Sequence, residues 1–75
     1  MELPSGFRIV LFSHPDYDQL TAEIYYHDDF VALVSQENGQ FQIELDSPRS
    51  ALRRKYALEA FRGALDKAKD RLSER

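Results

Sequence analysis

Four short stretches in the first 46 residues of this 75-residue chain alternate between apolar and polar side chains. A period of two is that of a β-strand with one buried face, so the sequence predicts strands over residues 7–12, 20–26, 30–36 and 41–46. A second pattern follows, with steps of three and four residues, which is typical of a helix with one apolar side. It predicts a helix over residues 56–73, and its stripe is Leu58, Phe61, Leu65, Ala68 and Leu72.

The connections between the strands predict how they pair. Asn38-Gly39 favours a two-residue hairpin turn, because both residue types tolerate a positive φ. For the preceding connection we expect a three-residue loop over residues 27–29, which places Tyr26 opposite Phe30. A two-residue turn at Asp28-Asp29 would shift the register by one residue and turn the apolar side chains to the opposite face.

Together these elements predict an α+β fold, an antiparallel four-stranded β-meander with one C-terminal helix packed on one face. We expect a single domain over residues 1–75, because so short a chain lacks the apolar surface for two cores. Two structures remain open for residues 47–55. Ser47-Pro48 could begin an earlier helix, or Leu52–Tyr56 could form a short extra strand.

Charge is divided unevenly along the chain. Residues 1–48 carry nine acidic side chains and one basic one, Arg8, whereas residues 49–75 carry nine basic and four acidic ones. The net charge of −3 is therefore the sum of an acidic N-terminal part, the acidic front (residues 1–48), and a basic C-terminal part (residues 49–75). Direct binding of nucleic acid is not expected, because the acidic front would repel a duplex.

Several classes of chemistry are not expected. The chain has no cysteine, and neither His14 nor His27 has the spacing of a metal site, so we predict no metal and no cofactor. No nucleophile elbow, phosphate-binding glycine loop or zinc-protease motif occurs, so we predict that the protein is not an enzyme. Without a long apolar run or a signal peptide, a cytoplasmic protein is expected.

The sheet face that the helix does not cover is the candidate binding surface. It should present Thr21, Glu23, Tyr25, Val31, Leu33, Ser35, Gln42, Glu44 and Asp46. An apolar centre with a carboxylate rim is typical of a protein-binding patch, although it is also compatible with an ordinary solvated face. Glu44 and Asp46 would project about 6.6 Å apart, close to two phosphate steps along a nucleic-acid strand.

We predict the roles of the candidate partner-binding residues as follows. Three carboxylates would take the place of phosphates, namely those of Glu23, Glu44 and Asp46. Two further aspartates, Asp28 and Asp29, would form a rim. Two side chains, Tyr25 and Leu33, would anchor the partner through apolar contact. An open alternative is a homodimer formed through Tyr25, Val31 and Leu33, so the chain is expected to be a monomer or a homodimer.

Two segments carry a resemblance. The stretch from Leu20 to Gly39 and the run from Leu58 to Leu72 resemble a group of small bacterial and phage-borne proteins with four strands and a closing helix. In size, acidity and element order the chain also resembles phage anti-CRISPR proteins, including inhibitors of type I complexes. That resemblance implies a DNA-mimicking inhibitor of a target-recognition subunit, in a host cytoplasm if the protein is phage-encoded. Toxin-immunity proteins are similar in style and imply a plugged nuclease site instead.

Overall fold

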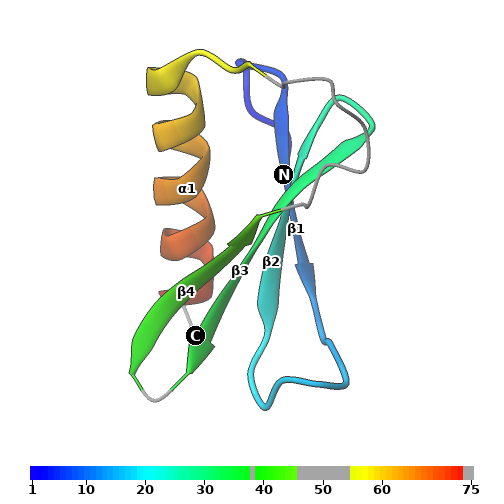
Figure 1. Cartoon of the computed structure of the whole chain (residues 1–75), viewed down its shortest axis with the longest axis vertical. Helices are drawn as coiled ribbons and strands as arrows, with labels where there is room; N and C mark the ends of the chain where they lie inside the picture. Colours follow the sequence, from blue (N-terminus) through cyan, green and yellow to red (C-terminus); the bar gives the residue numbers. More distant parts are fainter. Residues whose placement is uncertain (38, 46–54, 74–75) are drawn as a thin grey trace.

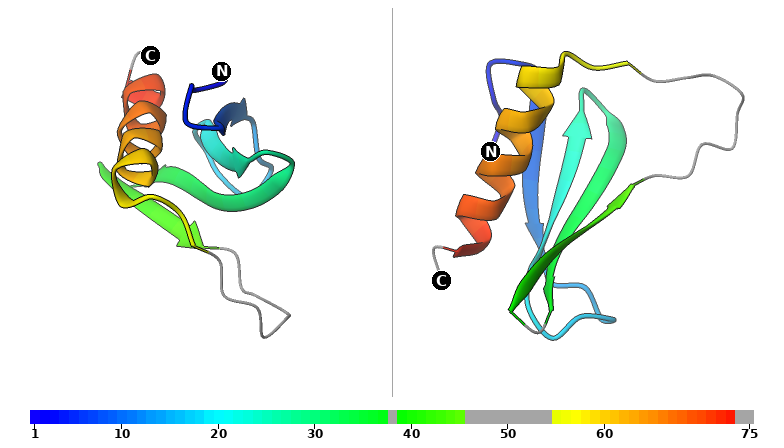
Figure 2. Two further views of the ribbon diagram at one scale, coloured as in Figure 1. Left: turned by 90° about the horizontal axis from the view of Figure 1, so that it is seen from above. Right: turned by 60° about the vertical axis from the view of Figure 1, so that its left-hand side comes forward.

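The computed structural model of the chain describes residues 1–37, 39–45 and 55–73. One antiparallel sheet has the strand order β1-β2-β3-β4, and a helix, α1, lies across one of its faces (Figure 1, Figure 2). The predicted α+β meander with a C-terminal helix is therefore confirmed. The elements are β1 (Phe7–Phe12), β2 (Thr21–Tyr26), β3 (Asp29–Glu37), β4 (Gln40–Leu45) and α1 (Leu58–Ser73).

The predicted element bounds hold within two residues. β1 has the predicted bounds, and the helix begins at Leu58 rather than at Tyr56. Its first turn is closed by the Phe61 N–H, which donates to the Ala57 carbonyl at 3.0 Å, so Ala57 occupies the position just before the helix. The open alternatives for residues 47–55 concern a segment of which only Lys55 lies within the described residues.

The β2–β3 connection differs from the prediction of a three-residue loop. Tyr26 pairs with Asp29, so the turn has two residues, and His27 adopts a positive φ of 56°. A β-bulge then restores the expected pairing of the rest of the two strands. Because of this bulge, Val31 points into the core and is 6% exposed, so its predicted place on the outer face was wrong.

The core lies between the helix and the sheet. Phe7 is the largest buried side chain of the core. The centre of its ring lies within 6 Å of the ring centres of Tyr26, Tyr56 and Phe61. On the helix, Ala64 and Ala68 are fully buried, which lets the helix backbone approach the strands closely. The buried stripe therefore follows the alanines, and Leu58, which the spacing placed on the apolar side, is 70% exposed.

The N-terminal residues extend the sheet beyond β1. The Ile9 N–H donates to the Met1 carbonyl at 2.7 Å, and the Leu3 N–H donates to the Phe7 carbonyl at 2.8 Å. Gly6 makes the return possible, because its φ of +97° lies in a region that L side chains rarely adopt. The outer edge of β1 is thus partly paired within the chain.

Replacing Gly6 by alanine should destabilise the fold by about 1–2 kcal/mol, because a side chain there is strained at a positive φ. A Cβ atom at this position would also lie 3.2 Å from Cε1 of Tyr26. Urea denaturation monitored by circular dichroism measures the change. Gly63→Ala is the matched control: a Cβ meets nothing within 4 Å there, so this helical position should gain about 0.5–1 kcal/mol. Equal effects of the two variants would contradict this account.

Candidate interaction surface

Two carboxylates lie in one row across the outer face of the sheet. Leu33 of β3 pairs with Glu23 of β2 on one side and with Glu44 of β4 on the other. Adjacent strands are about 4.8 Å apart, so the Cα atoms of the two glutamates are separated by roughly 10 Å. The structure therefore brings together three of the predicted site residues.

Leu33 does not serve as the exposed anchor that the sequence predicted. It is only 7% exposed, and its outer-face neighbours Thr21 and Ser35 are almost completely buried. The β1–β2 loop contacts this face, because its Tyr17 hydroxyl donates to Oε1 of Glu44 on β4. β3 lies between β2 and β4 in the sheet, so this hydrogen bond reaches β4 from a loop that is attached at β1 and β2.

The same burial removes the predicted homodimer surface. Of its three members, Val31 belongs to the core and Leu33 is buried, which leaves Tyr25. One half-buried tyrosine offers little apolar area, so a stable twofold contact on this face is not supported.

Local contacts order the β1–β2 loop. The Thr21 hydroxyl donates to the Phe12 carbonyl at 3.0 Å, joining the two ends of the loop. The His14 ring stands edge-on to those of Phe12 and Tyr17, with centroids 5.9 Å and 5.2 Å apart. The Asp16 N–H also donates to Nδ1 of His14 at 3.1 Å. These contacts fix the position of the Tyr17 ring relative to the sheet.

Tyr17 lies among carboxylates from three separate segments. Its hydrogen bond to Glu44, together with the negative charges of Glu44, Glu37 and Asp16, raises the pKa of Tyr17 to about 12. Asp16 lies in the β1–β2 loop, Glu37 ends β3 and Glu44 belongs to β4. We call Tyr17, Asp16, Glu37 and Glu44 the Tyr17 cluster. The β1–β2 loop and the β3–β4 turn lie at the same end of the sheet (Figure 1), and Tyr17 reaches from there to Glu44.

Tyr25 occupies a different part of the outer face. Its hydroxyl donates to Oε1 of Glu23 at 3.2 Å, and its ring stands edge-on to Phe30 at 5.7 Å. The Arg8 guanidinium lies 4.8 Å from the ring centre. Burial and the Glu23 charge raise the pKa of Tyr25, while Arg8 acts in the opposite direction. The single base in residues 1–45 is thus held beside Tyr25, outside the Tyr17 cluster.

The remaining predicted site residues do not join the row. Asp28 lies in the β2–β3 turn and Asp29 begins β3, both exposed. That turn is at the opposite end of the sheet from the β1–β2 loop (Figure 1). Glu23 lies three residues before the end of β2, so about 10 Å of strand separates it from that turn. Asp46 lies outside the described residues.

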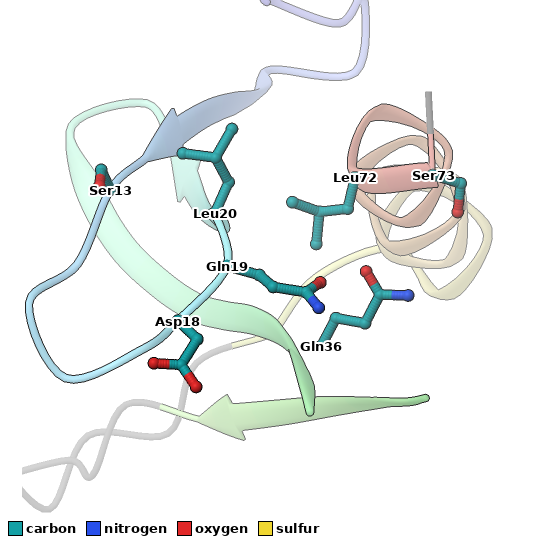
Figure 3. Close-up of a pocket in the computed structure, with 7 residues that line it drawn as sticks. All are labelled: Ser13, Asp18, Gln19, Leu20, Gln36, Leu72 and Ser73. Carbon is teal, nitrogen blue, oxygen red and sulfur yellow. The ribbon is translucent and has the colours of Figure 1, made fainter. Parts of the chain in front are cut away.

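A hollow of about 590 Å³ lies between the β1–β2 loop, β3 and the C-terminal end of α1. Figure 3 shows the amides of Gln19 and Gln36 directed toward the space near Leu72. Asp18 is the one ionisable residue among the lining residues, which the figure labels. Among the described residues, no group of three histidine or acidic side chains is arranged to hold a metal ion. None of the described helices is long and apolar enough to span a membrane.

Sequence reasoning assigned no site role to Tyr17, Asp16 or Glu37. No local signal could have found the cluster, because Tyr17 and Glu44 are 27 residues apart. Comparison with protein-family models, with curated proteins and with solved structures found no match to this chain. A function must therefore be inferred from the geometry of the described residues.

We predict that one of the four tyrosines ionises near pH 12 and that this step disappears in Tyr17→Phe. A pKa raised in the folded state means that the Tyr17 contact stabilises the fold fully below pH 10, the ordinary tyrosine pKa. That stabilisation is lost as the pH rises from 10 to about 12. Ultraviolet titration of the phenolate measures the step, and urea denaturation across this pH range measures the stability.

Glu44→Gln is the matched control for the charge. Its amide oxygen can still accept a hydrogen bond from the Tyr17 hydroxyl, but the negative charge is gone. The ionisation of Tyr17 should therefore move down toward pH 10. A titration curve of Tyr17→Phe that keeps the step near pH 12 would show that another tyrosine is responsible.

Proposed function

We propose that this protein is a non-enzymatic inhibitor that binds a basic, nucleic-acid-binding surface of another protein through its acidic loop end. In its most specific form it is an anti-CRISPR-like DNA mimic that blocks target binding by a CRISPR surveillance complex. The observation that supports this proposal is the Tyr17 cluster, in which carboxylates from three segments act on one tyrosine.

The charges of the cluster suit a cationic partner. Asp16, Glu37 and Glu44 are all exposed, and the one lysine or arginine of residues 1–45, Arg8, lies over the Tyr25 ring instead. A surface that binds nucleic acid gains most of its affinity from lysine and arginine contacts to phosphates. Exposed carboxylates can make the same charge-assisted contacts, so the cluster would compete for those side chains.

The β1–β2 loop is already ordered before any partner binds. Binding costs less free energy when the contacting groups are already held in place. Tyr17 is held by the His14 ring and by its hydrogen bond to Glu44, so the neighbouring Asp16 carboxylate lies on an ordered loop. Leu33 is buried and takes no part in this surface. In the proposed contact, the Tyr17 ring is the central apolar group instead.

Two targets fit the same chemistry. A surveillance complex and a toxin nuclease both present basic grooves that hold nucleic acid, so an anti-CRISPR protein and an immunity protein would use similar carboxylates. They differ in what they inhibit. The discriminating measurement is inhibition of target-duplex binding by a purified type I complex, compared with inhibition of a purified bacterial nuclease.

We expect Asp16→Lys combined with Glu37→Lys to weaken binding to the surveillance complex by about tenfold or more and to flatten its salt dependence. Both side chains are exposed, so the fold should be retained. Mobility-shift competition with target DNA at two or more salt concentrations gives the measurement.

The control is Asp28→Lys combined with Asp29→Lys, which changes the net charge equally at the opposite end of the sheet. It should change the affinity only a few-fold, through long-range attraction alone. Equal losses in the two double variants would show that the net charge matters and that the Tyr17 cluster does not.

A further inference from the structure

The outer edge of β4 is unpaired among the described residues. The sheet order places β4 at one end, whereas the other end, β1, is partly paired by residues 1–3. An unpaired edge presents N–H and C=O groups that can add a further strand. Proteins usually protect such edges with charged side chains, lysine above all, with proline or with a bulge. β4, Gln40–Leu45, has one charged side chain, Glu44, and no lysine, proline or bulge.

The helix also leaves the inner side of β4 incompletely covered. Leu45 pairs with Ala32 and Ile43 pairs with Val34, so their side chains share the helix-side face. Yet Ile43 is 45% and Leu45 66% exposed. The helix packs on β1, β2 and part of β3, and a groove of about 220 Å³ separates it from β4. This edge is therefore both open and apolar.

The geometry points to a second copy of this chain as the occupant of the edge. We propose that two β4 strands pair antiparallel about a twofold axis, so that the two sheets become one of eight strands. Directly opposite residues in antiparallel strands share a face. In a twofold pair, a residue therefore meets one whose number has the same parity, and apolar residues meet apolar ones.

The side chains select one register. With the axis at Ile43, Phe41 faces Leu45 of the second copy, and the two Ile43 side chains face each other. On the outer face, Gln42 then meets Glu44 of the second copy, an amide that can donate to a carboxylate. An axis at Glu44 would place two carboxylates directly opposite, which is unfavourable. An axis at Gln42 would leave Leu45 without an apolar partner.

The backbone agrees with this register. A two-residue connection closes on a hydrogen-bonded pair, here Glu37 and Gln40. Because the direction of the backbone groups alternates along a strand, those of Phe41, Ile43 and Leu45 point to the free edge. These are the three residues that the proposed register pairs. The contact is short, so we expect a dimer dissociation constant on the order of tens of micromolar.

Sedimentation equilibrium from about 5 µM to about 500 µM tests the proposal, because this range brackets the expected dissociation constant. The wild-type mass should rise toward that of a dimer. Ile43→Lys should weaken dimerisation by about 100-fold or more, because two ammonium groups would meet on the axis. Ile43 is half exposed, so this variant should fold, and circular dichroism and thermal melting verify it.

Gln42→Lys is the matched control on the same strand. Its ammonium group would face Glu44 of the second copy, so the dimer should persist or strengthen at low salt. A wild-type protein that stays monomeric over the whole range would overturn the proposal and leave the edge to another partner. So would dimerisation of Ile43→Lys equal to that of the wild type, or loss of the dimer in Gln42→Lys.

Discussion

Close packing of one short helix against the sheet is the constraint on which the rest of this structure depends. Ala64 and Ala68 have no exposed surface, so the helix backbone lies close to the strands beneath it. A helix is about 10 Å wide, which covers two or three strands spaced 4.8 Å apart. Here those strands are β1, β2 and part of β3. The fourth strand is left half covered, which is why its apolar side chains reach solvent.

The sequence predicted the elements well because each depends on a local pattern. Alternation of apolar and polar residues located four strands, and the turn at Gly39 set the register of β3 and β4 as expected. The β2–β3 connection shows where local patterns end. Two different connections restore the same pairing of Ile24 with Ala32: a three-residue loop, or a two-residue turn followed by a bulge. Alternation cannot separate them, yet only the bulge moves Val31 into the core.

The candidate surface was less predictable because it is made by tertiary contacts. The sequence placed Glu23, Leu33 and Glu44 correctly on one face, and strand register then sets them in one row. It could not show that the β1–β2 loop contacts this row or that Leu33 is buried. That arrangement depends on the Tyr17–Glu44 hydrogen bond, whose partners belong to different strand pairs. Loop direction is decided by such contacts, and the residues of the loop carry no periodic signal.

The three sides of β4 link the two proposed surfaces. Its inner side meets the helix at Phe41, whose ring centre lies 5.4 Å from the Lys69 ammonium. Its outer side carries Glu44, which holds the Tyr17 ring, and its edge is open. Because side chains alternate along a strand, an edge pairing that uses the Phe41, Ile43 and Leu45 backbone leaves Glu44 on the outer face. A second copy would therefore add to the edge while the Tyr17 hydrogen bond to Glu44 stays intact, and Asp16 and Glu37 of the Tyr17 cluster take no part in the pairing.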